Sequence, residues 1–262
     1  MSFKRSPLRA GIAAAAFVLP ALAPVAAAAT TAAPSVFAPM QHVASSSSTP
    51  FFISHGGVHF ANTTSTNWAG YADNGSNGAY TSVSTTFVQP KVTCSSGDTY
   101  SAFWVGLDGY ASDSVEQTGT EADCAGRTAE YSAWYEMYPA NPVTYNKTVK
   151  PGDTIVETVT FSGSNKYTLY LDDKTENWTE STSKTGSYAR SSAEVIAEAP
   201  YDGSVLPLAN FGTVNFGSST VNGSSLASGN PTGINMVSSS GAAEATTGSL
   251  SGGSFSITWN SK

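Results

Sequence analysis

The sequence predicts an all-β fold, an antiparallel β-sandwich. Apolar and polar residues alternate over short runs, which is the pattern of strands with one buried and one solvated face. Gly, Asn, Asp, Pro and Ser separate the runs, as in 73–75 and 151–153, and these residue types form the turns between strands. Heptads and a long helical stripe of apolar residues are both absent from the sequence. A sandwich is favoured over a barrel because several runs divide into one apolar and one polar face.

The individual strands follow from this alternation. In the first run, Val83, Thr85 and Phe87 point to one side. In a later run, Tyr131 and Met137 point away from the side that carries Glu136. The expected strands are 83–88, 100–107, 130–137, 155–161, 167–171, 193–197, 213–216 and 255–259.

Residues 1–29 are expected to be a secretion signal. Lys4, Arg5 and Arg9 give a basic start, an apolar run follows, and small residues at 26–29 suit a signal peptidase. The apolar run is interrupted by Pro20 and is shorter than the ~20 residues that a membrane-spanning helix needs. The mature protein is therefore predicted to be exported, to the periplasm or the extracellular medium, and not to be held in a membrane.

Residues 30–62 are rich in Ala, Ser, Thr and Pro, a composition that does not build a core. They are interpreted as a prosegment or a disordered linker. Residues 63–262 are then one domain, of a length typical for a single folded unit.

Charge and cysteine content narrow the partners and the compartment. After residue 60 the chain carries nineteen acidic and nine basic residues, a formal charge of −10. Nucleic acids and anionic membrane surfaces are therefore poor partners, and we expect a monomer. Cys94 and Cys124 are the two cysteines, and in an exported protein they are predicted to form one disulfide, worth on the order of 3 kcal/mol.

The position of the histidines excludes several mechanisms. The three histidines are His42, His55 and His59, so the predicted domain has none. Hydrolases with a Ser-His-Asp or Cys-His site need an imidazole, and catalytic zinc sites usually use one as a ligand. We therefore expect no metal and no cofactor, and acid-base chemistry carried by carboxyl groups at acidic pH.

Two aromatic residues each lie near a carboxylate. On a continuous strand Trp104 and Asp108 would share a face, while Phe103, Val105 and Leu107 would form the core side. The alternative is a Trp that covers the sheet and an Asp that starts a turn before Gly109.

Trp134 and Glu136 also share a face, and an aromatic ring beside a carboxylate is a common lining of a peptide or sugar groove. It is equally common as plain packing beside a surface acid. Two such pairs together favour a groove.

Two further stretches offer groups for chemistry. Glu194 and Glu198 lie on one face of an otherwise apolar strand, where burial would raise their pKa and prepare them for proton transfer. The alternative is two solvated acids on an exposed sheet face. Gln117 follows in polar surroundings, and its amide could hold a water and a substrate carbonyl together, unless it is an ordinary loop residue.

These stretches together resemble the eqolisins, a family of glutamic peptidases. The motifs occur in the family's order and at similar separations over about residues 65–220, and they are Asn-Trp-Ala-Gly at 67–70, Trp-Val-Gly-Leu-Asp-Gly at 104–109, Gln-Thr-Gly at 117–119, Ala-Trp-Tyr-Glu-Met-Tyr-Pro at 133–139 and Ala-Glu-Val-Ile-Ala-Glu at 193–198.

The resemblance implies a concanavalin-like sandwich of two curved antiparallel sheets. It also implies an acid endopeptidase with a Gln117–Glu198 dyad and weak inhibition by pepstatin. Trp104, Asp108 and Glu136 match groove residues, whereas the family's Asp four residues after the Gln is here Glu121, with Asp123 close by.

Two other functions remain open on the residues alone. One is a glycoside hydrolase on a similar sandwich, with Glu136 and Glu198 as its carboxyl pair, which would need a separation of ~5–9.5 Å. The other is a carbohydrate-binding module in which Trp104 and Trp134 are stacking platforms.

Overall fold

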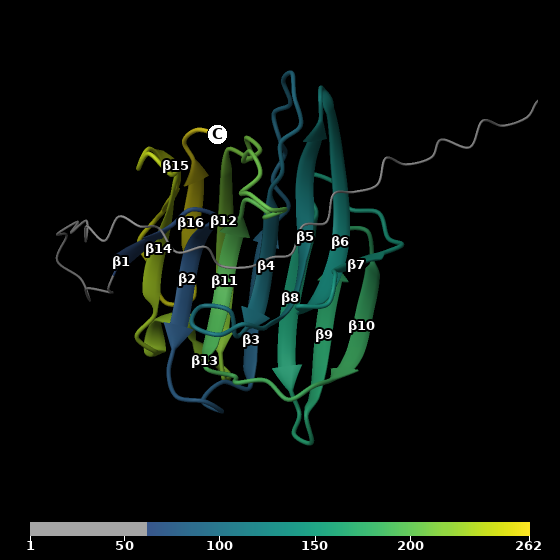
Figure 1. Ribbon diagram of the computed structural model, residues 1–262. Coiled ribbons are helices and arrows are strands. Elements are labelled where there is room, and N and C mark those ends of the chain that lie inside the picture. Colours follow the sequence, from purple (N-terminus) through teal and green to yellow (C-terminus); the bar gives the residue numbers. More distant parts are fainter. Residues whose placement is uncertain (1–61) are drawn as a thin grey trace, which may run out of the picture. The chain divides into compact units, whose positions relative to one another are not determined.

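The computed structural model describes residues 62–262, which form sixteen strands and one short 3-10 helix (Figure 1). The elements are β1 (Asn62–Ser65), β2 (Trp68–Asn74), β3 (Ser82–Val88), β4 (Ala102–Leu107), β5 (Val115–Ala125), β6 (Thr128–Tyr138), β7 (Val143–Tyr145), β8 (Thr154–Phe161), β9 (Lys166–Asp173), β10 (Trp178–Thr185), β11 (Ser192–Glu198), β12 (Thr213–Val221), β13 (Ser224–Ser225), η1 (Leu226–Ser228), β14 (Thr232–Val237), β15 (Ala243–Thr247) and β16 (Phe255–Trp259).

The strands form one hydrogen-bonded path that folds into two layers. Its order is β10-β9-β8-β3-β12-β16-β15-β14-β2-β11-β4-β5-β6-β7, and all pairs along it are antiparallel. β4 packs on β8 and β5 on β9, so the half of the path from β14 to β7 covers the half from β10 to β15. The predicted all-β, antiparallel sandwich is confirmed. β1 pairs with β14 in parallel.

The main core lies between the layers and comes from alternate positions of the facing strands. Phe103, Val105 and Leu107 of β4 are fully buried there, as the alternation predicted. They meet Ile155 and Val159 of β8. A second, smaller cluster lies on the other face of the β14–β7 layer, and its buried members are Trp68, Ala72, Ala102, Trp104, Val115, Trp134, Ile196 and Ile234.

The sequence missed several strands for identifiable reasons. β5 is buried along nearly its whole length, although most of its residues are polar or charged, so it shows no apolar alternation. β10 has no apolar residue after Trp178 and alternates only between partly and fully exposed positions. β2, β14 and β15 were also not predicted as strands; β2 is buried on both faces, and a strand of that kind does not alternate.

The disulfide prediction is confirmed. Cys94 and Cys124 are bonded, with Cα atoms 5.5 Å apart, and they join the segment before β4 to the end of β5. The predicted signal and prosegment, 1–29 and 30–62, lie outside the described residues except at Asn62. Within 62–262 no helix has the length and apolar character to cross a bilayer.

The main core contains a glutamate whose carboxyl group makes no described hydrogen bond. Glu157 on β8 is fully buried, and within the described part of the chain neither of its carboxyl oxygens has a hydrogen-bond partner. Burial raises the pKa of this carboxyl well above its ordinary value. The folded protein therefore keeps Glu157 protonated where the unfolded chain would ionise it, so stability is full in acid and falls as pH rises above about 4.3.

We predict that Glu157→Gln makes the protein less sensitive to neutral pH. The amide keeps the size of the side chain and cannot ionise, so the Tm at pH 7 should rise by roughly 2–8 °C while the Tm at pH 4 changes little. Thermal unfolding followed by circular dichroism at both pH values measures this. Glu180→Gln on β10, which removes a partly exposed ion pair with Lys147, is the control and should leave the pH dependence as it is. Equal Tm changes at both pH values in Glu157→Gln would contradict the argument.

Candidate active site

The register of five neighbouring strands places the candidate residues on one face of the β14–β7 layer. Gln117 on β5 lies opposite Gly106 on β4 and Glu136 on β6. Glu198 on β11 lies opposite Ala102 on β4 and Trp68 on β2. These positions surround the smaller apolar cluster, and all the candidate side chains on this face are almost completely buried.

The carboxylate of Glu198 is held by two uncharged donors. Nδ2 of Asn67 donates to Oε1 and Nε1 of Trp104 donates to Oε2, each at 2.9 Å. Burial raises the pKa of Glu198 well above its ordinary value, and the charge of Glu136 raises it further. Hydrogen bonding from Trp68, Trp104 and Asn67 opposes the rise, because donors stabilise the ionised form.

Gln117 and Glu136 are directly joined. Nε2 of Gln117 donates to Oε2 of Glu136 at 2.5 Å. Next to them, Oγ1 of Thr118 donates to the carbonyl of Trp134 and ties β5 to β6 at this level. Because Glu136 also acts electrostatically on Glu198, one carboxyl group lies close enough to influence both members of the expected dyad.

Trp104 reaches Glu198 because the strand beside it carries a glycine. Gly119 lies opposite both Trp104 and Trp134. A Cβ at Gly119 would come within 2.6 Å of Cβ of Trp104 and 2.4 Å of the Phe103 carbonyl, so no larger residue fits without displacing the strand. The Trp104 ring also packs edge-on against Trp68, with centroids 4.9 Å apart. Sequence reasoning included Asn67, Trp68 and Gly119 in motifs but gave none of them a role.

Asp108 lies past the end of β4 and not on the strand face of Trp104. β4 ends at Leu107, and Asp108 has a left-handed backbone with φ 70°. The structure matches the alternative, an Asp that begins a turn. Its buried carboxylate accepts hydrogen bonds from the backbone N–H groups of Arg190 (2.5 Å) and Ser191 (2.8 Å) and from Oγ of Ser191 (3.0 Å). Asp108 thereby fixes the segment that leads into β11.

Glu194, the other glutamate of β11, has different neighbours from Glu198. It pairs with Gly106, so it lies in the same row as Gln117. Burial raises its pKa, the Ser192 hydroxyl lowers it and the charge of Asp108 raises it again. Its electrostatic neighbours are Asp108 and Glu116 rather than Glu136.

Glu121 and Asp123 both lie beside the site. They are the two acids that the sequence offers in place of the family's Asp. Oε2 of Glu121 accepts a hydrogen bond from Oγ of Ser132 at 3.0 Å. Burial, and then the charge of Asp123, raise the pKa of Glu121 well above its ordinary value, and Glu136 contributes in the same direction. Oδ1 of Asp123 accepts from the backbone of Ser101 at 3.0 Å, and burial raises the pKa of Asp123 to about 7.

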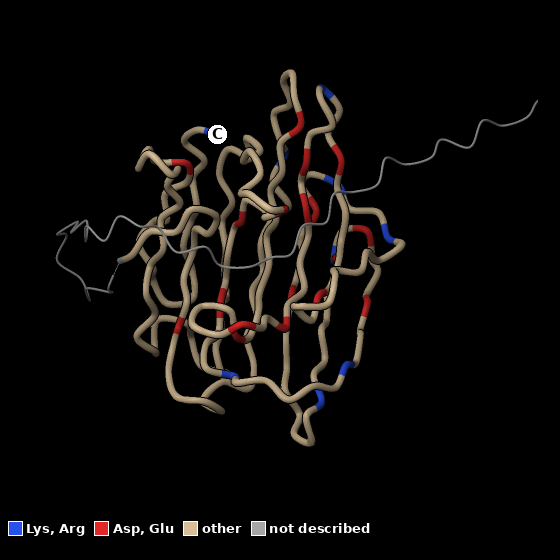
Figure 2. The backbone as a smooth tube through the Cα atoms, viewed as in Figure 1, with Lys and Arg blue, Asp and Glu red and all other residues tan. Residues whose placement is uncertain are grey.

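Positive charge is kept away from this face. Figure 2 shows acidic residues along the central strands, whereas the lysines and arginines of residues 62–262 lie in turns or at strand ends. Lys147, Lys150 and Lys174 make the described ion pairs, all with partners outside the site. The described contacts of the site carboxyl groups are therefore hydrogen bonds from uncharged donors.

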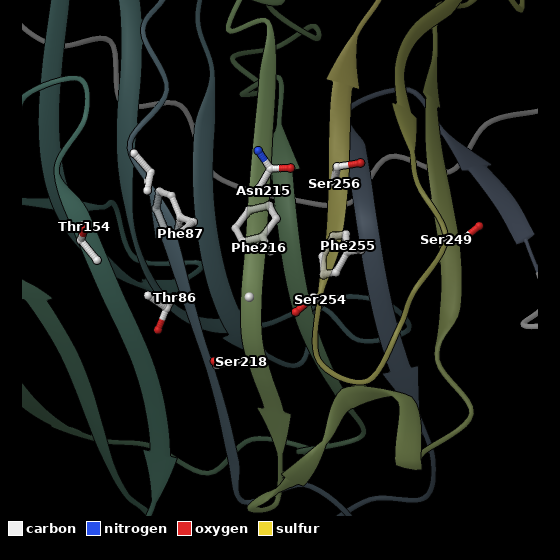
Figure 3. Close-up of a pocket in the computed structure, with 12 residues that line it drawn as sticks. Thr86, Phe87, Thr154, Asn215, Phe216, Ser218, Ser249, Ser254, Phe255 and Ser256 are labelled. Carbon is white, nitrogen blue, oxygen red and sulfur yellow. The ribbon is translucent and has the colours of Figure 1, made fainter.

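A separate depression lies on the other layer. It has a volume of about 560 Å³ and is formed by β3, β12 and β16 with the start of β8 (Figure 3). Its lining is rich in hydroxyl groups and contains no charged residue and none of the candidate site residues.

Comparisons with known proteins agree with this fold. The model of the peptidase A4 family matches residues 66–259. A crystal structure of scytalido-glutamic peptidase with a transition state analog inhibitor is similar at 26% identity and TM-score 0.66, over 74% of this chain and 98% of that one. The structure of SCP-B, a member of the eqolisin family, in complex with the tripeptide Ala-Ile-His is similar at 25% identity and TM-score 0.62, over 74% and 98%.

Aspergilloglutamic peptidase from Aspergillus niger has 24% identity and TM-score 0.53, over 62% of this chain and 99% of that one, and supports the fold alone. Comparison with curated protein sequences gives no match. The fold and the buried carboxyl and amide groups, together with these findings, define a glutamic endopeptidase built on a β-sandwich. The chain belongs to the peptidase A4 family, the eqolisins.

We predict that Gly119→Ala damages both the fold and the site. The new methyl group would displace Trp104 or the β4 backbone, at a cost of roughly 1–3 kcal/mol of unfolding free energy, and would weaken the bond from Trp104 to Glu198. Urea unfolding at pH 4 measures the loss. Gly217→Ala is the matched control, since its nearest atoms would be 3.8 Å away, an ordinary contact. If both variants unfold at the same urea concentration, the close approach at Gly119 has no energetic importance.

Proposed function

We propose that the protein is a secreted acid endopeptidase whose Gln117 and Glu198 activate a water molecule against a peptide bond. The observation that supports this most directly is the linkage of the two residues on one face. Glu198 is held by Asn67 and Trp104, and Gln117 by Glu136, which in turn acts on Glu198. Peptides are the proposed substrates, in agreement with the peptide and transition state analogs bound by similar structures.

The proposed reaction uses no covalent intermediate. Ionised Glu198 takes a proton from the water as the water oxygen attacks the scissile carbonyl carbon. Gln117 orients this water and donates its amide N–H to the developing oxyanion, a contribution of about 3 kcal/mol to the barrier. The C–N bond then breaks, and Glu198 returns its proton to the leaving amine, so the carboxyl group is restored.

The pKa shifts explain why acid is the expected medium. Burial favours protonated Glu198, but the reacting water hydrates the carboxylate and adds to the donors Asn67 and Trp104, which favour ionisation. At higher pH the neighbouring acids ionise in turn. Asp123, whose pKa burial raises to about 7, and Glu121 would then place negative charge beside the site. We therefore expect a bell-shaped profile with its maximum in acid.

We also propose the maturation path expected from the sequence. Residues 1–29 are removed on export and 30–62 are a prosegment, leaving 63–262 as a monomeric enzyme without nucleic acid or membrane partners. We expect activity of the shortened form. The mass and N-terminal sequence of the secreted protein, with assays before and after processing in acid, test this path.

Substitution of the dyad should abolish proteolysis. Gln117→Ala and Glu198→Gln are each expected to reduce kcat/KM on casein in mild acid by at least about 10³-fold, since one removes the amide and the other the base. Circular dichroism should show an unchanged fold. Glu194→Gln is the matched control, a buried glutamate four positions earlier on the same strand, and should keep activity within about tenfold. Activity that survives in Glu198→Gln, or is lost only in Glu194→Gln, would assign the base elsewhere.

Inhibitor and substrate tests distinguish the proposed peptidase from the two alternative functions. Pepstatin addresses a pair of aspartates, so it should inhibit weakly at concentrations that abolish pepsin activity. Release of sugar from glucans would point to a glycoside hydrolase with Glu136 and Glu198 as its carboxyl pair. Sugar binding without any turnover would point to a carbohydrate-binding module.

A further inference from the structure

We propose that Glu136 is a positioning residue that selects the orientation of the Gln117 amide and, through its charge, sets the acidic limit of activity. This inference rests on the proposed function, since it concerns how the same dyad is prepared for catalysis. It assigns to Glu136 a task other than contact with substrate.

The first support is the direction of the hydrogen bond between the two side chains. Gln117 and Glu136 are register partners on β5 and β6, both are fully buried, and Nε2 donates to Oε2. An amide presents two donors on one side and an acceptor on the other, whereas an ionised carboxylate only accepts. Glu136 therefore favours the rotamer with Nε2 towards β6. Because the amide is planar, this choice also fixes its second N–H and its oxygen.

The proposed reaction needs the Gln117 amide to be held in one orientation. Gln117 has to hold the water and donate to the oxyanion in the same turnover, which a freely flipping amide would do only part of the time. With Glu136 in place, the folded protein already holds the amide in one orientation before substrate binds.

The second support is the set of groups that face Glu136. From β5 these are Gln117 and Glu121, and from β11 it is Glu198. The groups around Glu198 itself are Asn67, Trp68 and Trp104, all uncharged. The contacts described for Glu136 involve no lysine or arginine, and Glu136 acts on Glu198 as a like charge. Such a charge disfavours ionised Glu198 and moves the acidic limb of kcat/KM to higher pH.

Two substitutions separate the hydrogen bond from the charge. Glu136→Gln removes the charge and keeps an acceptor oxygen, so kcat should fall by less than about tenfold while the acidic limb moves to lower pH. Glu136→Met removes both, so kcat should fall by about tenfold to a hundredfold at nearly constant KM, with the same movement of the limb. Rates on a chromogenic peptide between pH 2 and pH 6 measure kcat, KM and the position of the acidic limb.

Glu157→Gln is the matched control. Glu157 is also a fully buried carboxyl, but it lies on β8 in the other layer, in the main core and away from the site. This variant should keep kcat within about threefold of the parent and leave the acidic limb unmoved.

The outcomes distinguish this inference from the proposed function. If Glu198→Gln stays active, the dyad itself is wrong. If Glu198→Gln is inactive while Glu136→Met keeps the parent kcat, Glu136 does not position Gln117. Should Glu136→Met fail to fold, the pH profile of Glu136→Gln decides, because an unmoved acidic limb overturns the role of the charge.

Discussion

The hydrogen bonds from Asn67 and Trp104 to Glu198 are the interaction on which the arrangement of the site depends. They hold a carboxylate in a fully buried position without a basic partner. A buried carboxylate without such donors would stay protonated or would destabilise the fold. Several other features serve this contact. Gly119 makes room for Trp104, Trp68 packs edge-on against the Trp104 ring, and Asp108 fixes the segment that starts β11.

Several other buried carboxyl groups of residues 62–262 also have raised pKa values. Burial, and then the charge of Asp108, raise the pKa of Glu116 to about 9, while Glu157 and Glu194 are also fully buried. Each of these groups binds its proton more tightly in the folded chain than in the unfolded chain, so acid favours the folded state. Most proteins lose buried ion pairs in acid. In this protein protonation of the buried acids stabilises the folded state. Acidic conditions therefore suit both the proposed chemistry and the fold.

The sequence was sufficient for features that depend on local patterns. Alternation located β3, β8 and β9, the two cysteines gave the disulfide, and the motifs of 104–109 and 133–139 indicated the family. Features that depend on long-range pairing were not accessible. β5 has no apolar alternation because most of its buried residues are polar or charged, and their partners can lie far away in the sequence, as when Thr120 donates to Gln89 after β3.

For Asp108 the sequence offered both a strand face and a turn, and periodicity could not decide between them because it does not reveal a positive φ. Nor could spacing alone distinguish Glu194 from Glu198. Their different neighbours arise from the loop after β4 and from β6, and the relation of those segments to β11 is fixed only by the sheet register.

The hydroxyl-lined depression on the β3, β12 and β16 face has a consequence for the enzyme in solution. In acid the carboxylates take up protons, the net charge of the chain shrinks, and mutual repulsion no longer keeps the molecules apart. Ser and Thr hydroxyl groups do not titrate, so the polar part of this lining stays uncharged at every pH at which the enzyme would work. A glutamate introduced among these hydroxyl groups would lose its charge in acid, so it would add to the repulsion between molecules mainly at higher pH.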